Sequence, residues 1–294
     1  MARQTSPPTQ RFGAHMSIAS GLHNACTAGL DAGCDCLQVF VKNQRQWVAP
    51  PLTDEAVREW KRAVRRTGLH PIVAHGTYLI NLASPDATNR KRSIDAHIDE
   101  LTRCEALGIR YLVAHPGSHV GQGEAVGIRR IAGALNRIHR ATAGFKVRTL
   151  LETTAGQGTN LGYRFEHLAE IIARVGAPER VDVCLDTCHL FAAGYDFRRP
   201  DGYQAMMADF ERLVGMRRIK CIHVNDSKQA CGSRVDRHEH IGRGKLGTAG
   251  FRQILNDPRL AKVPRILETP KGEDDKGRDL DRVNLARLRR LIRR

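Results

Sequence analysis

The sequence has no run of about 18 consecutive apolar residues, so no helix is expected to cross a membrane. The N-terminal segment MARQTSPPTQR lacks the apolar middle of a secretory signal, and residues 1–11 are expected to form a short disordered lead-in. The eight cysteines are scattered and are not arranged as the paired cysteines of a zinc finger. We therefore expect reduced, mostly buried thiols and a cytoplasmic location.

Acidic residues are also in short supply. The chain has 31 Asp and Glu against 47 Lys and Arg, a formal net charge of +16, and the tail 271–294 supplies only +4 of it. A solvated surface could carry a smaller excess with no partner. At +16 a polyanion is the favoured partner, and nucleic acid is the usual candidate because neutralising its phosphates releases counterions.

Eight short apolar runs do occur, and each ends abruptly in a polar residue followed by a loop. They are RFGAHMS, CLQVFVKN, PIVAHG, YLVAHPGS, TLLETTAG, VDVCLDTCH, IKCIHVND and RILETP. Amphipathic segments such as 54–68, 124–143 and 165–176 separate them and predict helices. For 54–68, Thr53 is the expected N-cap and Gly68 the stop.

This alternation predicts an α/β fold, a single-domain (β/α)8 TIM barrel over residues 12–294 that includes a basic C-terminal helix. The alternative, a doubly wound open sheet, usually has fewer strands and gives no reason for so many polar strand ends. In a barrel these strand ends converge on one mouth, where active sites lie.

Imidazoles and carboxylates dominate those strand ends. They are His75, His115, Glu152, Asp186 with His189, His223 with Asp226, and Glu268. Taken singly, each could be a satisfied core or loop residue. Together they make a ligand set that suits zinc, manganese or iron better than calcium. Seven or more ligands imply two or three ions, and a bridged pair about 3.5–4 Å apart acts on phosphate esters.

The segment VDRHEHIG adds Asp236 and His238, which point to the same side of an extended segment because they are two residues apart. They could chelate one ion together, with His189 as a third ligand. The alternative is a solvated polar loop.

Nine segments of the sequence match a known family in the same order. No single motif among them would be specific enough to indicate that family. The segments are GAHMSIASGL, VFVKNQRQW, AHGTYLINLASPD, LVAHPGSHVG, LLETTAGQGTNLG, CLDTCHLFAAGYD, HVNDSK, SRVDRHEHIGRG and LETP. In this order the chain resembles the endonuclease IV family of abasic-site DNA repair enzymes over roughly residues 12–270. The resemblance implies a barrel that holds three zinc ions, with manganese in some members.

The resemblance also implies which residues hold which ion. His75, His115 and Glu152 match the ligands of a first ion, and Glu152 bridges to a second ion. Asp186, His223 and Glu268 complete that second site, and His189, Asp236 and His238 match the third. Asp226 is not a ligand in the family and is expected to orient His223 or a loop. Glu239, between two histidines, departs from the family pattern.

The implied activity is hydrolysis of the phosphodiester 5′ to an abasic site, which leaves a 3′-hydroxyl and a 5′-deoxyribose phosphate. Trimming of 3′-blocking groups accompanies it. Glu152 and Glu268 are the expected catalytic carboxylates. The expected partner is double-stranded DNA with abasic sites or 3′-blocked ends, bound by a monomer. Arg45, Tyr78 and Leu79, in the loops KNQRQW and GTYLIN, are expected to enter the base stack.

Two other functions stay open. One is a sugar isomerase or epimerase of the xylose-isomerase-like barrels, which has no need of a third metal site or of a charge of +16. The other is a catalytically silent DNA-damage binder, which intact ligands at nine positions disfavour.

Overall fold

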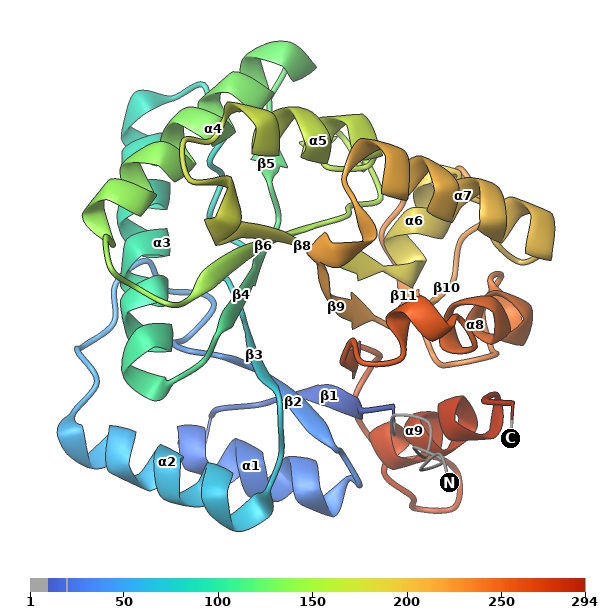
Figure 1. Ribbon diagram of the computed structural model, residues 1–294. Coiled ribbons are helices and arrows are strands. Elements are labelled where there is room, and N and C mark those ends of the chain that lie inside the picture. The colour runs from blue at the N-terminus through green and yellow to red at the C-terminus, as the bar shows by residue number, and fades with distance from the viewer. Residues whose placement is uncertain (1–9, 20, 294) are drawn as a thin grey trace, which may run out of the picture.

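The computed structural model describes residues 10–19 and 21–293 and contains a closed barrel of eight parallel strands (Figure 1). Their order around the barrel is β1-β12-β9-β8-β6-β4-β3-β2. The strands are β1 (Phe12–Met16), β2 (Cys36–Phe40), β3 (Ile72–His75), β4 (Tyr111–Ala114), β6 (Arg148–Glu152), β8 (Val181–Asp186), β9 (Ile219–His223) and β12 (Arg265–Leu267). Each coincides with one of the eight predicted runs, and only β6 begins one residue before its run, at Arg148. The predicted TIM barrel is confirmed, and the open sheet is wrong.

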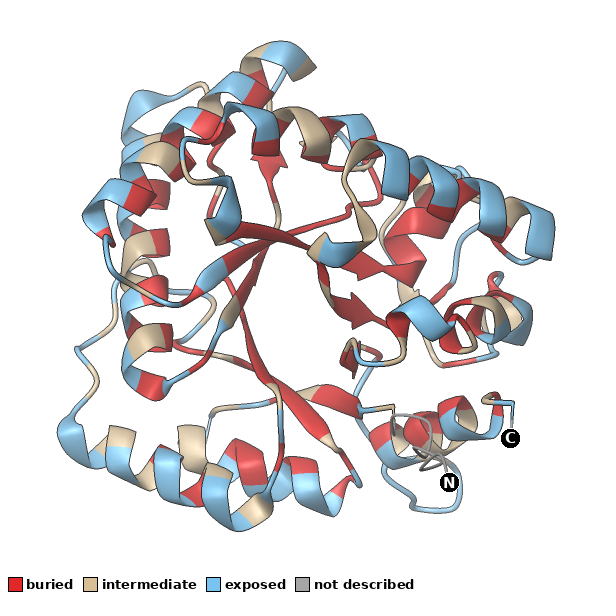
Figure 2. Ribbon diagram, in the orientation of Figure 1, coloured by how far each residue is buried: buried red, intermediate tan, exposed pale blue. Residues whose placement is uncertain are grey.

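The helices surround the ring of strands (Figure 1). They are α1 (Leu22–Asp31), α2 (Asp54–Thr67), α3 (Ala87–Leu107), α4 (Glu124–Ala141), α5 (Phe165–Arg174), α6 (Thr187–Ala193), α7 (Pro200–Leu213), α8 (Gly247–Leu255) and α9 (Leu280–Arg290). Helix α2 begins and ends as predicted, because the Thr53 side chain accepts from the Ala56 N–H and Gly68 adopts a left-handed φ of 68°. Figure 2 shows the helices exposed on their outer faces and the strands buried.

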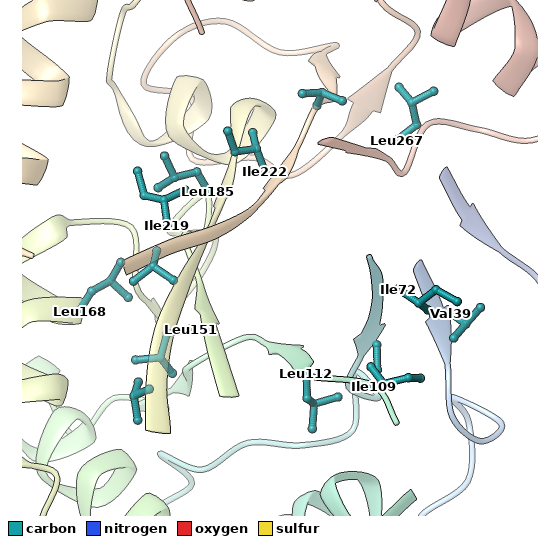
Figure 3. Packing of buried hydrophobic residues seen from close by; sticks show 14 of the residues in the cluster. Val39, Ile72, Ile109, Leu112, Leu151, Leu168, Leu185, Ile219, Ile222 and Leu267 are labelled. Atoms are coloured by element: carbon teal, nitrogen blue, oxygen red, sulfur yellow. The ribbon is translucent and has the colours of Figure 1, made fainter. Parts of the chain in front are cut away.

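Apolar packing between the helices and the outside of the barrel forms the main core. Figure 3 shows aliphatic side chains such as Leu151 and Leu185 of the strands and Leu168 of α5 in this layer. Helix α9 joins it through Leu285 and Leu288, which are fully buried against the β1 and β12 side of the barrel. All eight cysteines are free and seven are buried, as predicted.

Short connections complete the chain. They are the 3-10 turns Pro178–Arg180, Met216–Arg218 and Pro258–Leu260, the ribbon of β5 (Gly117–Ser118) with β7 (Asn160–Leu161), and the ribbon of β10 (Asp226–Ser227) with β11 (His238–Glu239). Of the predicted lead-in 1–11, residues 1–9 lie outside the described residues, whereas the side chains of Gln10 and Arg11 donate to the carbonyls of Leu255 and His70. Across the described ranges, no helix has the length and apolarity needed to cross a membrane.

The barrel interior is built in two layers that follow the two-residue period of the strands. The lower layer is apolar and fully buried: Cys36, Val73, Val113, Leu150, Cys184, Cys221 and Ile266. Two residues further along each strand lies the barrel-mouth layer, which is polar: Gln38, His75, His115, Glu152, Asp186, His223 and Glu268. On β1 the same positions hold Gly13 and His15. Only glycine fits at position 13, since a Cβ there would lie 2.0 Å from the Cys36 carbonyl oxygen.

Candidate metal centre at the barrel mouth

Glu152, at the end of β6, is the centre of the polar cluster and is fully buried. Its Oε2 lies 3.2 Å from both His75 Nε2 and His115 Nε2. Its Oε1 lies 3.0 Å from His223 Nδ1 and 3.3 Å from His189 Nδ1. Burial raises the pKa of this carboxyl, but the His223 and His115 imidazoles outweigh burial and hold that pKa well below its ordinary value. Glu152 is therefore an anion shared by four imidazoles.

Three groups of potential ligands meet around this carboxylate, each with its donor atoms within 4.8 Å of one another. They are the His75 group (His75, His115, Glu152), the Asp186 group (Glu152, Asp186, His223, Glu268) and the Asp236 group (His189, Asp236, His238). The structure thus brings together all nine residues that the sequence analysis predicted to be metal ligands. Two further groups, Cys184 with Cys221 and His223, and Asp186 with Cys188 and His238, share members with these three.

The hydrogen bonds of three histidines leave a lone pair facing the cluster. The Nδ1 atoms of His75, His189 and His238 lie 2.7, 2.8 and 3.1 Å from the carbonyl oxygens of Gly76, Thr153 and Glu268. A carbonyl can only accept, so each Nδ1 carries the proton and each Nε2 is free to bind a cation. Such orientation of the ring is the usual support of a metal-binding histidine.

Two buried histidine nitrogens that lack a satisfying hydrogen bond also fit a metal ion. The Nε2 atoms of His189 and His238 are buried with no hydrogen bond that satisfies either, although Asp236 lies 3.0 and 3.4 Å away. Burial raises the pKa of Asp236, but His189 outweighs it and lowers that pKa to about 2. Buried lone pairs and ionised carboxylates without donors are the surroundings in which a divalent cation is stable. The donor set, nitrogen and oxygen without a required thiolate, suits zinc or manganese.

The three residues nominated for DNA contact lie on loops at the same mouth. Arg45, after β2, is exposed, and Tyr78, after β3, is 60% exposed. Leu79 is half-buried. The Tyr78 ring lies 5.5 and 5.8 Å from the rings of His75 and His115, so it borders two of the candidate ligands directly.

Helix α3 holds both loops in place, a feature that sequence reasoning missed. Lys42 is buried, and its Nζ donates to the Trp47 carbonyl at 3.1 Å and to Asp99 at 2.9 Å. Arg103 donates to the carbonyls of Ala49 and Pro50 at 2.9 and 2.7 Å, which secures the far end of the Arg45 loop. One helix turn away, Glu100 Oε1 accepts from the Thr77 N–H at 3.1 Å, beside Tyr78. The loops therefore have a rigid, charged support.

Two cavities open beside the ligands. The larger, about 700 Å³, is lined among others by His15, Phe40, Lys42, Tyr78, Glu268 and Lys271. The smaller, about 240 Å³, is lined among others by His115, Gln157, His189, Asp236 and Arg237. Both cavities are lined by candidate metal ligands together with basic side chains, a combination that suits an anionic ligand.

The sequence left the roles of Asp226 and Glu239 open, and in the structure both carboxylates contact loop residues and not the candidate ligands. Asp226 accepts from the backbone N–H groups of Ser227, Gly242, Leu246 and Gly247 at 2.8–3.2 Å. Of its two expected roles, Asp226 therefore orients a loop and not His223. Glu239 belongs to none of the ligand groups and lies 4.0 Å from Lys228 Nζ.

Comparisons with known proteins agree with this architecture. Residues 26–291 match the family of xylose isomerase-like TIM barrels. A protein named "Probable endonuclease 4" from Chloroflexus aurantiacus is 52% identical over 282 residues, which cover 96% of this chain and 98% of the relative. A protein of the same name from Geobacter sulfurreducens is 52% identical over 283 residues, with 96% and 95% covered.

Among the solved structures, an endonuclease IV superposes on this chain better than a sugar-epimerase-like protein does. The crystal structure of endonuclease IV from Thermus thermophilus superposes with a TM-score of 0.84 at 34% identity, covering 96% of this chain and 98% of that one. A D-tagatose 3-epimerase-like protein superposes with a TM-score of 0.71 at 16% identity, with 96% of both chains covered. The second similarity extends to the fold alone.

Proposed function

This chain belongs to the endonuclease IV family within the xylose isomerase-like TIM barrels, and we propose that it is a metal-dependent apurinic/apyrimidinic endonuclease. Its substrate is double-stranded DNA with abasic sites or 3′-blocked ends. The chain hydrolyses the phosphodiester 5′ to an abasic site, leaving a 3′-hydroxyl and a 5′-deoxyribose phosphate, and also trims 3′-phosphate and related blocks. The observation that carries the proposal is the gathering of three ligand groups around the buried carboxylate of Glu152: two of them share it, and the Asp236 group lies beside it through His189.

The His75, Asp186 and Asp236 groups would hold one ion each, zinc or manganese, for a total of three. When bound, these ions supply Lewis-acid stabilisation of phosphoryl oxygens and activation of water near neutral pH. Glu152 is held ionised by the imidazoles around it and is the group best placed to accept a proton from the attacking water. Glu268 lines the larger cavity and is the second proposed catalytic carboxylate, which would act by holding an ion of the Asp186 group beside the phosphate. Lys271, which is paired with Asp281, lines the same cavity and supplies positive charge toward that phosphate.

The position of the cluster requires a displaced nucleotide. Glu152 and His223 are fully buried, so a phosphate within a regular duplex cannot reach them. An abasic nucleotide is the least costly to swing out because it has no pairing or stacking to lose. Arg45 and Tyr78 extend from loops held by α3 and fill the space that it vacates. The net charge of +16 supports duplex binding, which we propose occurs as a monomer.

The test of this function is nicking of a duplex that carries one abasic analogue. We expect a single incision on its 5′ side with a 3′-hydroxyl end, and no incision of the undamaged duplex. Turnover of ketose sugars without nicking would favour the isomerase, and tight lesion binding without nicking would favour the silent binder. The Asp236 group is the observation against the isomerase, since a single ion or one pair is enough for that chemistry.

Substituting Arg45 by alanine should lower the preference for the lesion. We expect the ratio of lesion to undamaged duplex affinity to fall about tenfold, the size of one specific contact, because Arg45 contacts only the distorted site. Competition binding with both duplexes measures this ratio. Arg58→Ala, an exposed arginine on α2 on the outside of the barrel, is the matched control. Equal losses on both duplexes in Arg45→Ala would contradict insertion.

A further inference from the structure

Gln38 occupies the barrel-mouth layer on β2 and is fully buried, yet it belongs to none of the ligand groups. We propose that Gln38 is a positioning residue: it sets which nitrogen of His223 is free to bind a metal ion and couples His223 to Glu268. This inference rests on the proposed function, because it concerns the same metal centre.

The neighbours of Gln38 determine the orientation of its amide. One amide atom lies 2.5 Å from Glu268 Oε1, and the other lies 2.8 Å from His223 Nε2. An ionised carboxylate can only accept, so the atom beside Glu268 is the amide nitrogen. The amide oxygen then faces His223, and His223 Nε2 has to donate. The second amide hydrogen is directed to His15 Nδ1, 2.9 Å away.

This hydrogen bond selects the tautomer of His223. An imidazole that binds a metal ion is neutral and carries one proton, and with that proton on Nε2 the lone pair is on Nδ1. Nδ1 is the atom that faces the ligand group, at 3.0 Å from Glu152 Oε1, 3.1 Å from Glu268 Oε2 and 3.7 Å from Asp186 Oδ2. With the opposite tautomer an N–H would point at the ion.

His223 differs from its neighbours in this respect. His75, His189 and His238 present Nε2 and are oriented by backbone carbonyls, which no substitution removes. His223 presents Nδ1 and is oriented by a side chain. The same side chain holds Glu268, so one amide orders two of the four members of the Asp186 group. Loss of such a partner typically weakens metal affinity about 10–100-fold.

Packing alone does not account for a glutamine at this position. The residues two positions before and after it in β2, Cys36 and Phe40, are apolar. A methionine would fill the same volume without placing an amide in the barrel. All three contacts of the amide go to members of the barrel-mouth layer, and two go to proposed ligands.

The experiment compares zinc binding by metal-free Gln38→Met, Gln38→Glu and the parent chain, in competition with a chromophoric chelator. We expect Gln38→Met to lose about 10–100-fold in affinity for one of its ions. Gln38→Glu keeps an acceptor for His223 Nε2 and should recover part of that loss. Thr149→Val is the matched control, because Thr149 is a buried polar residue of β6 that contacts His97 and no proposed ligand. It should bind zinc like the parent.

A second readout is the tautomer itself, from two-bond proton–nitrogen NMR of 15N-histidine-labelled, zinc-loaded protein. The parent and Gln38→Glu should show His223 with its proton on Nε2, and Gln38→Met should lose that single pattern. Unchanged zinc affinity and an unchanged tautomer in Gln38→Met would overturn the inference. Loss of the tautomer in Gln38→Glu would also overturn it, because the new carboxylate still accepts from His223 Nε2. Nicking by the parent chain reports on the proposed function separately, since a parent that binds zinc without nicking overturns that function alone.

Discussion

The Glu152→Gln variant is expected to nick an abasic duplex at least about 100-fold more slowly than the parent chain, and to bind that duplex with nearly unchanged affinity. The reason is local. Glutamine keeps the volume of the side chain but removes the charge on which four imidazoles converge. It also places an amide N–H₂ where only acceptors belong, so the His75 and Asp186 groups both lose a ligand. Duplex affinity depends on surface charge, which this change leaves in place.

The measurement combines single-turnover nicking with duplex binding by fluorescence anisotropy. Glu239→Gln is the control, because it removes a carboxylate at the same mouth that belongs to no ligand group. It should nick within about twofold of the parent, as surface changes usually have small effects. A melting curve shows that Glu152→Gln is folded. Cleavage by Glu152→Gln at the parental rate would remove Glu152 from the mechanism.

Sequence periodicity anticipated the barrel and the gathering of the strand-end residues for one physical reason, whereas the full set of nine candidate ligands came from the family resemblance. Each parallel strand is a short apolar run, and its carboxyl end is where the chain leaves the core. His75, Glu152 and Asp186 could therefore be assigned to one mouth before any contact was known. The two-residue period within the strands also indicates which residues face the interior of the barrel. In CLQVF it already placed Gln38 on the same inward face as Cys36 and Phe40.

Other features were not accessible from sequence because they depend on distant partners. Gln38 meets His223 and Glu268 across 185 and 230 residues. Asp226 resembles Asp186 in sequence, since each follows a run rich in apolar residues, yet Asp226 accepts from backbone N–H groups of the loop 242–247. The support of the Arg45 loop by Arg103 likewise joins segments more than 50 residues apart. Side-chain direction at a strand end is decided by tertiary packing.

Removal of divalent cations should abolish nicking and destabilise the fold together. Glu152, Asp186 and Glu268 are carboxylates packed within one ligand group, and Asp236 lies beside His189. Without cations their repulsion is offset only by the neighbouring imidazoles and by a few N–H donors, among them the amides of Gln38 and Asn225. At a free concentration 100 times Kd, each bound ion contributes about 2.7 kcal/mol to the free energy of unfolding. For a chain of 294 residues that corresponds to roughly 4 °C in melting temperature per ion.

The measurement treats the protein with a chelator, removes the chelator by dialysis, and follows nicking and melting as ions are added back. We expect zinc or manganese to restore both, with about three ions per chain at saturation. Calcium is the control ion. It prefers six to eight oxygen ligands, and a site with five imidazoles cannot supply them, so it should restore neither property. Nicking that persists at the full rate in the chelated protein would contradict a metal-dependent mechanism. Saturation at one ion per chain would contradict three separate sites, because the His75, Asp186 and Asp236 groups each provide enough donors for an ion of their own.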